Sequence, residues 1–288
     1  MKRTRTTQAA AAPAASPSEL RVSSSVLTDP GCVRETNEDS ARVFNPNDPA
    51  LVADKGVLAV VADGMGGHAA GEVASRIAVE TVGRVYYAEP GGAREALTRA
   101  FAAANAEIFA AARADEELRG MGTTCTALAL VGGAAHAAHV GDSRLYLLRG
   151  GEIYQLTEDH SAVMELVKRG VITPEEARRH EDKNVILRAL GTTPSVEVEA
   201  WDEPLAARDG DTFLLCSDGL CDLVGDEELR DLTLASADTH EACEKLVARA
   251  RERGGHDNIT VAVIALASAA EFGAARAPRE TRELEVGG

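Results

Sequence analysis

Aromatic residues are scarce in this chain of 288 residues, because Phe, Trp and Tyr together make up only 3% of it. A core must therefore be built from aliphatic side chains, which supply most of the 45% of residues that are hydrophobic. Long apolar runs are absent too, and no segment approaches the roughly 18–20 uninterrupted apolar residues that a transmembrane helix needs. The N-terminal segment after Lys2, Arg3 and Arg5 is too weakly hydrophobic for a signal peptide.

An excess of positive charge is also missing, since the formal net charge is −16 at pH 7. Nucleic acid and anionic membrane would be repelled by such a chain, so neither is expected as a partner. The five cysteines include no Cys-x-x-Cys pair, which fits neither a disulfide framework nor a zinc knuckle. We interpret them as reduced thiols and expect a soluble, cytoplasmic protein.

The chain divides into one long patterned segment between two biased ends. Residues 1–20 are rich in Ala, Thr, Ser and Pro without periodicity, which predicts a disordered tail. The pattern is lost again in residues 269–288, which we interpret as a second tail. Residues 21–268 have the length of one domain and contain no internal repeat.

The patterned segment predicts an α+β fold. Short apolar runs bounded by Gly or Asp predict strands at 57–62, 124–131, 135–140, 144–148, 212–216 and 259–265. Apolar periodicity predicts two consecutive helices, over residues 72–87 and 94–113. Two helices in succession do not suit a βαβ alternation, whereas tight Gly-Gly turns suit antiparallel pairing. We expect a four-layer α-β-β-α sandwich of two antiparallel sheets flanked by helix pairs.

Four aspartates mark the ends or the approaches of these apolar runs: Asp63, Asp142, Asp218 and Asp257. Carboxylates at strand ends can converge on one oxygen-only cation site, which is the chemistry of Mg²⁺ or Mn²⁺. Taken singly, an Asp-Gly pair is more often a turn. Asp257 could merely cap, and Asp142 could merely pair with Arg144. Together, the four segments are more specific than any one of them.

Two further features surround these aspartates. Glycine after Asp63 lets the backbone approach a ligand closely, so that the carbonyl of Gly64 could bind a cation. In the β-prone segment 31–40, Arg34 and Glu38 would share one face of a strand. There Arg34 could grip a phosphate bidentately while Glu38 faces a metal, directly or through water. A surface charge cluster is an equally open interpretation.

These segments resemble the metal-dependent protein phosphatase family, protein phosphatase 2C, and in particular its bacterial branch, over roughly residues 22–267. The motifs that carry the resemblance occur in the family's order: Arg34…Asn37-Glu38-Asp39, Asp63-Gly64-Met65-Gly66-Gly67, Gly122-Thr123-Thr124, Gly141-Asp142-Ser143-Arg144, Ser217-Asp218-Gly219 and Asp257-Asn258. The resemblance implies a centre of two Mn²⁺ or Mg²⁺ ions between the sheets. It also implies hydrolysis of phosphoserine and phosphothreonine in proteins by a metal-activated water.

Residue by residue, the resemblance implies that Asp63 bridges two metal ions. Asp218 and Asp257 would complete the first ion's ligands, while the Gly64 carbonyl and, through water, Glu38 would serve the second.

Four other positions also receive roles from the resemblance. Asp142, with Asp218 again, resembles the ligands of a weaker third ion. Asp39 would stand behind the ligands, Asn258 would support them, and Arg34 would clamp the phosphate.

The proton donor to the leaving group is left open. Animal members of the family carry a histidine directly after the Asp-Gly pair, where this chain has Met65. His160 is one candidate general acid and a metal-bound water is another, while a purely structural role for His160 is as open. Residues 162–190, with Pro174 in the first turn of a short helix, resemble the family's flap beside the active site. An ordinary helical excursion is the alternative.

The hypothesis is therefore a monomeric signalling enzyme, a protein serine/threonine phosphatase whose partners are phosphorylated proteins, serine/threonine kinases and the substrates of those kinases. Two alternatives stay open. One is a catalytically silent phosphoprotein-binding regulator on the same fold, although the filled set of Asp63, Asp218 and Asp257 argues against it. The other is a dedicated phosphatase of a partner-switching pathway.

Overall fold

The computed structural model describes residues 20–66 and 69–268. The two predicted tails lie outside the described residues, except for Leu20, which begins the first strand. Gly67 of the glycine-rich motif also lies outside the described residues. Among the described helices, none combines the length and the apolar character that crossing a membrane would require.

Two antiparallel sheets form the centre of the molecule. The first has the strand order β1-β12-β11-β7-β8, with bounds Leu20–Asp29, Ile259–Ser268, Thr212–Cys216, Arg144–Arg149 and Glu152–Gln155. The second has seven strands, ordered β10-β6-β5-β3-β2, with bounds Leu205–Ala206, Ala134–Val140, Cys125–Val131, Val57–Met65 and Asp39–Phe44. Two short strands complete it, β4 (Gly122–Thr123) against β3 and β9 (Glu199–Ala200) against β6.

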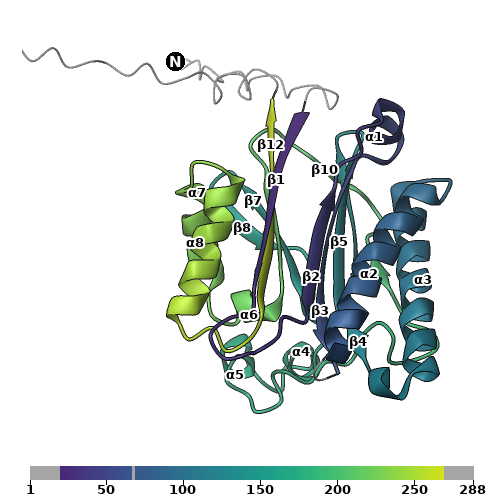
Figure 1. Cartoon of the computed structure of the whole chain (residues 1–288). Coiled ribbons are helices and arrows are strands. Elements are labelled where there is room, and N and C mark those ends of the chain that lie inside the picture. The colour runs from purple at the N-terminus through teal and green to yellow at the C-terminus, as the bar shows by residue number, and fades with distance from the viewer. Residues whose placement is uncertain (1–19, 67–68, 269–288) are drawn as a thin grey trace, which may run out of the picture.

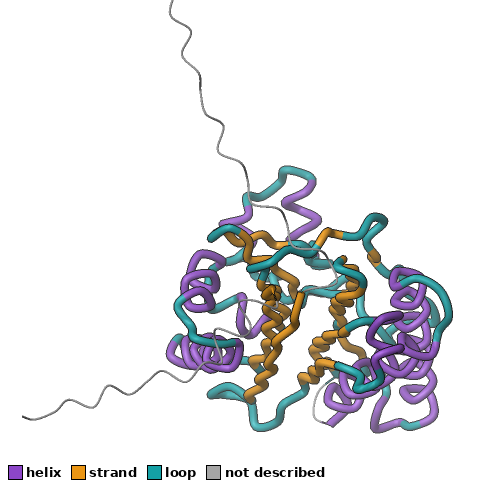
Figure 2. Tube along the Cα trace, turned by 90° about the horizontal axis from the view of Figure 1, so that it is seen from above, coloured by secondary structure: helices purple, strands orange, loops and turns teal. Residues whose placement is uncertain are grey.

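Helices cover the outer face of each sheet. Helices α2 (Ala69–Ala88) and α3 (Ala93–Ala114) flank the second sheet, while α7 (Asp226–Leu234) and α8 (Thr239–Glu252) flank the first (Figure 1). Figure 2 shows the four layers from above, with the two sheets between the helix pairs. The predicted α-β-β-α sandwich is confirmed. The remaining helices are α1 (Pro49–Lys55), α4 (Ala162–Lys168), α5 (Pro174–Ala177), α6 (Asp218–Cys221) and the 3₁₀ turn η2 (Glu116–Leu118).

Alternation along the strands divides the core into layers. In β3, Leu58 and Val60 pack under the helix pair α2–α3, whereas Ala59 and Val61 face the other sheet. Successive side chains of a strand point to opposite faces, so a strand covered on both sides must be apolar throughout. Residues 57–62 are accordingly all buried, which fixes the position of the strand end that follows them.

The predicted strands correspond to β3, β5, β6, β7, β11 and β12, and both predicted helices are present. The expectation that the segment around Arg34 is a strand is wrong, because residues 30–38 form the loop between β1 and β2. Pro30 has no N–H to pair, and Gly31 adopts a φ of 81° while its N–H donates to Asp29 Oδ1 at 2.8 Å. The shared strand face of Arg34 and Glu38 therefore does not exist.

Candidate metal centre

Five aspartates from five separate segments of the sequence meet at one end of the sandwich. Asp39 begins β2 and lies opposite Asp63 in β3. Asp142 occupies the turn from β6 to β7, Asp218 follows β11 as the first residue of α6, and Asp257 stands just before β12. Antiparallel pairing brings these strand starts and strand ends to the same edge. The structure therefore gathers the carboxylates that the sequence singled out.

Three of these carboxylates have a buried oxygen without a hydrogen-bond partner. The Oδ1 atoms of Asp39, Asp142 and Asp218 are buried and make no hydrogen bond. Asp39 and Asp142 are each only 7% exposed. Placing a carboxylate in such surroundings is costly unless a cation or a proton neutralises it.

The pKa values of these aspartates reflect the same cost of burying their charges. Burial raises the pKa of Asp39 to about 7 and that of Asp218 to about 6. Burial also raises the pKa of Asp63 well above its usual range, and the nearby Asp39 and Asp218 carboxylates raise it further. The pKa of Asp142 is raised well above its usual range by burial and then by Asp218. A multivalent cation would offset both the cost of burying these charges and the repulsion between them.

The arrangement of the ligands is less converged than the resemblance implies. In the part of the chain that the structure describes, no three His, Cys, Asp or Glu side chains are spaced to hold a metal ion among them. Both oxygens of Asp257 are engaged instead, because Oδ2 accepts from Arg34 Nη2 and Oδ1 from the Asn258 N–H, each at 2.8 Å. The chemistry of the donors still fits a hard divalent cation, since every orphaned oxygen of the cluster belongs to a carboxylate.

Arg34 reaches the edge of the cluster from the loop before β2. Its side chain is 54% exposed, and its pKa is raised mainly by the hydrogen bond to Asp257. The charges of Glu38 and Asp63 also raise the pKa of Arg34. An exposed cation beside the buried carboxylates could bind an anionic group that approaches from solvent.

Asn258 holds that loop in place. Its side-chain oxygen accepts from the N–H of Glu38 at 2.8 Å, and its amide nitrogen donates to the carbonyls of Thr36 and Pro30 at 2.9 and 3.1 Å. Behind the cluster, Ser217 Oγ donates to Asp39 Oδ2 at 2.8 Å. Asn258 and Asp39 thus lie next to the expected ligands.

Close backbone packing fixes the end of β3 against the first turn of α2. The Gly64 N–H donates to the carbonyl of Glu38 at 3.1 Å, and a Cβ on Gly64 would lie 2.1 Å from the carbonyl oxygen of Gly71. A Cβ on Gly71 would lie 2.9 Å from the backbone carbonyl carbon of Gly64. Neither site can accept a side chain, so both glycines shape the centre. Sequence reasoning missed Gly71, because nothing local reveals which glycine of a helix meets a strand end.

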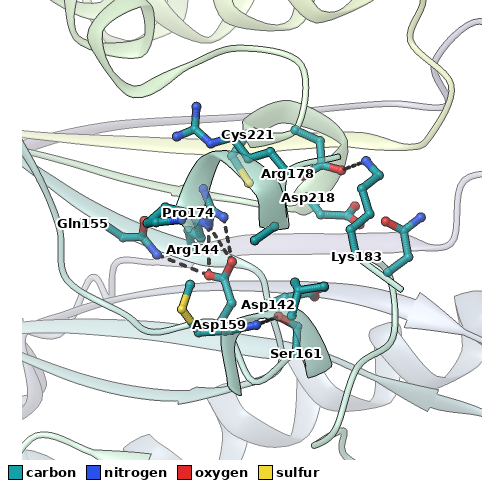
Figure 3. Close-up of a pocket in the computed structure, with 15 residues that line it drawn as sticks. Asp142, Arg144, Gln155, Asp159, Ser161, Pro174, Arg178, Lys183, Asp218 and Cys221 are labelled. Atoms are coloured by element: carbon teal, nitrogen blue, oxygen red, sulfur yellow. Dashed lines mark hydrogen bonds and ion pairs between the residues drawn. The ribbon is translucent and has the colours of Figure 1, made fainter. Parts of the chain in front are cut away.

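A pocket lies between Asp142, Asp218 and the segment that contains α4 and α5 (Figure 3). That segment contributes Pro174, Arg178 and Lys183 to the lining, and Lys183 Nζ donates to Asp222 in the turn after α6 at 2.5 Å. The short helix that begins at Pro174 is as predicted. The segment predicted as a flap therefore lines a pocket together with two aspartates of the cluster, Asp142 and Asp218.

Arg144 does not pair with Asp142, so that alternative is wrong. Its guanidinium binds Asp159, with Nη2 2.6 Å from Oδ2, and Gln155 donates to the same carboxylate at 3.2 Å (Figure 3). Strand pairing explains this choice, because the turn that carries Asp159 follows β8, the neighbour of β7. Asp142 is left without the cation that its sequence neighbour could have supplied.

His160 is buried beside Asp142 and is hydrogen-bonded on both sides of its ring. Nδ1 accepts from the N–H of Gly141 at 3.0 Å, and Nε2 lies 3.0 Å from Glu199 Oε2. Both ring nitrogens are therefore occupied by the protein itself. This favours the structural interpretation of His160 over the general acid that the sequence left open.

Known proteins share this arrangement of elements and motifs. A family model described as "Protein phosphatase 2C" matches residues 37–258. The serine/threonine protein phosphatase PstP of Mycobacterium tuberculosis is 44% identical over 237 residues, which cover 82% of this chain and 43% of that protein. This chain thus spans less than half the length of that relative. The serine/threonine phosphatase Stp of Listeria innocua is 39% identical over 242 residues, covering 82% of this chain and 93% of that protein.

A solved structure is similar over most of the fold. The crystal structure of the catalytic domain of the phosphatase PstP, in complex with two manganese ions, superposes with a TM-score of 0.73 at 38% sequence identity. The superposition covers 86% of this chain and all of that domain, 100%.

Proposed function

The chain belongs to the protein phosphatase 2C family, and from that premise we propose that it is a metal-dependent protein serine/threonine phosphatase. Phosphoserine and phosphothreonine in proteins are the proposed substrates, and Mn²⁺ or Mg²⁺ the proposed ions. The Mycobacterium and Listeria relatives are named serine/threonine phosphatases, and the PstP catalytic domain binds two manganese ions, which supports the assignment.

One observation carries the proposal: the orphaned carboxylate oxygens of Asp39, Asp142 and Asp218 at one edge of the sandwich. No stability argument accounts for them, because a buried carboxylate without a partner destabilises a fold. Buried carboxylates with strongly shifted pKa values cluster at functional sites. Divalent cations bound there would neutralise the carboxylates and lower the pKa of a water molecule for attack on phosphorus.

The protein's own residues have definite tasks in this proposal. Asp63, Asp218 and Asp257 would hold the ions, with the Gly64 carbonyl and Glu38 on the side of α2 and Asp142 on the side of the pocket. Release of Asp257 would leave the Arg34 guanidinium, 2.8 Å away, able to bind the phosphate of a substrate bidentately. Arg178 and Lys183 line the pocket beside this edge and would contact the chain that carries the phosphate.

Phosphorylated proteins are the proposed partners, and the serine/threonine kinases that phosphorylate them would act in the same compartment. We place that compartment in the cytoplasm and treat the protein as a monomer. The five unpaired thiols support a reducing location.

The experiment that tests the proposal measures hydrolysis of p-nitrophenyl phosphate and of a phosphothreonine peptide while Mn²⁺ is titrated into chelator-stripped protein. The Asp218→Asn variant, which keeps the shape of the side chain, is the matched control. Metal-dependent turnover that disappears in the variant is expected. Turnover without added metal would contradict the proposal, and so would equal turnover in the variant. Absence of turnover on both substrates at saturating Mn²⁺ would instead favour a phosphoprotein-binding module or a dedicated phosphatase.

A further inference from the structure

The residue before Asp142 is held by hydrogen bonds on both sides. Gly141 has a φ of 114°, and a Cβ there would lie 2.6 Å from Thr124, so only glycine fits. Its N–H donates to Nδ1 of His160 at 3.0 Å, and its carbonyl accepts from the backbone N–H of His160 at 2.7 Å. His139 Nε2 lies 2.9 Å from the same carbonyl. The backbone of Gly141 thus makes three hydrogen bonds with two histidines.

These contacts determine the tautomer of His160. Because Nδ1 accepts from an amide N–H, the proton of the neutral ring must be on Nε2. Two side chains lie near that nitrogen, Glu199 Oε2 at 3.0 Å and Arg188 Nη1 at 3.5 Å. The nearer Glu199 oxygen accepts the proton's hydrogen bond. The side chain of His160 is only 5% exposed. A ring in this state has no nitrogen to offer to a substrate.

These hydrogen bonds hold the backbone directly before the Asp142 carboxylate. Asp142 is buried with an orphaned oxygen among other carboxylates, which repel it. Its other neighbour, Ser143, is fixed as well, since its Oγ lies 2.7 Å from Thr124 Oγ1. The same Thr124 hydroxyl accepts from the N–H of Asp63 at 2.9 Å. The backbones of two carboxylates are therefore anchored to one hydrogen-bond network.

We propose that His160 is a positioning residue that fixes the Asp142 carboxylate for a divalent cation through Gly141, with Glu199 holding the other nitrogen of the ring. The inference rests on the proposed function, because it takes Asp142 to be a ligand. In this proposal His160 orients a metal ligand and does not act as a general acid. Residues that orient metal ligands through hydrogen bonds typically change metal affinity when they are altered.

Two substitutions of His160 separate the functions of its two nitrogens. The amide oxygen of His160→Asn can occupy the position of Nδ1 and accept from the Gly141 N–H, whereas the longer His160→Gln places its amide near the position of Nε2. Mn²⁺ binding to the chelator-stripped proteins is measured by titration calorimetry, with thermal melts as a check on folding. His160→Asn is expected to retain near-normal affinity, while His160→Gln lowers it about tenfold or more. Equal affinities in both variants, or equal losses, would overturn the proposal.

Turnover on two leaving groups separates positioning from acid catalysis. p-Nitrophenolate departs without protonation, but a threonine alkoxide needs a proton. Positioning predicts that His160→Gln loses rate on both substrates in the same proportion and recovers as Mn²⁺ is raised. A loss confined to the phosphothreonine peptide would show a general acid and overturn the inference, while leaving the proposed function intact. Lack of metal-dependent turnover in the unaltered chain would instead contradict the proposed function.

The exposed end of the network offers a test that does not threaten folding, because the Glu199 side chain is 41% exposed. Glu199→Gln can still accept from Nε2 of His160, whereas Glu199→Ala cannot. Loss of one hydrogen bond of about 1 kcal/mol corresponds to about fivefold weaker Mn²⁺ binding in Glu199→Ala. Identical Mn²⁺ affinity in the alanine and glutamine variants would contradict the role assigned to Glu199 and, with it, the network.

Discussion

Two buried aspartates in the same pocket have opposite surroundings. Asp159 accepts four hydrogen bonds, three from Arg144 and one from Gln155, so its charge is matched within the chain. Asp142 has an oxygen with no partner, and burial, followed by the carboxylates of Asp218 and Asp159, raises its pKa. The comparison teaches that burial alone does not mark a functional carboxylate. The distinguishing sign is a buried charge that the fold leaves unmatched.

The largest effect is expected where the unmatched cluster is interrupted. Asp218→Asn should lower metal-dependent turnover at least about a thousandfold, as loss of a key charge-stabilising group does in other hydrolytic sites. The same substitution should raise the melting temperature of the metal-free protein, because it removes a repelled, buried carboxylate. Parallel kinetics and thermal melts check both signs. A variant that is both active and less stable would contradict the claim that Asp218 carries an unmatched charge that serves function.

The matched ion pair should show the reverse pattern. Asp159→Ala leaves Arg144 buried without its partner and should lower the free energy of unfolding by about 3–5 kcal/mol. Glu116→Ala is the control, since the Arg119–Glu116 pair is 76% and 88% exposed and should contribute about 0–1 kcal/mol. Urea denaturation measures both variants. Similar losses of unfolding free energy at the two sites would mean that burial does not determine how much these ion pairs stabilise the fold.

A pH series sharpens the same contrast. The pKa values of about 7 for Asp39 and about 6 for Asp218 lie above those of the unfolded chain, so the folded state holds protons that the unfolded state has released. The free energy of unfolding of the metal-free protein should therefore fall as pH rises from about 5 to 7, by roughly 1–3 kcal/mol, and then level off. Melts in chelator at several pH values measure this slope. Asp218→Asn should flatten it, and an unchanged slope in that variant would contradict the assignment.

The smallest effect is expected at the exposed edge of the cluster. Arg34→Ala should raise KM for the phosphothreonine peptide about tenfold with a smaller change in kcat, if the guanidinium binds ground and transition states alike. Arg21→Ala, an exposed arginine near the start of β1, is the matched control. Steady-state kinetics would show the split. A fall in kcat alone would place Arg34 with the transition state and not with substrate binding.

These residues show which parts of the site and the fold could be predicted from the sequence. The segments of Asp63, Asp142 and Asp218 were found because each adjoins a short apolar strand, and such strands can be recognised from the local sequence. The partner of Arg144 was not found, because two strands and a turn decide it. Strand β1 was missed as well, since Ser23-Ser24-Ser25 breaks its apolar pattern and only the ten-residue pairing with β12 makes it a strand.

The loop before β2 was misread for a related reason. Its residues favour extended backbone one by one, yet Pro30, Gly31 and the side chain of Asn258 set its path. The two-sided hydrogen bonding of His160 is likewise a property of the tertiary structure, because Gly141 and Glu199 lie far from it in sequence. The sequence singled out candidate residues, and the tertiary structure decides which partners several of them contact.

Calorimetric titration of Mn²⁺ into the chelator-stripped protein at pH 6.5, repeated in buffers of different ionisation enthalpy, tests the central claim most directly. A cluster whose carboxylates have raised pKa values must release protons when a cation replaces them. We predict Mn²⁺ binding with net proton release that falls in Asp218→Asn and persists in Glu116→Ala. Absence of binding, or binding without proton release, would contradict the claim that these unmatched carboxylates form a metal centre.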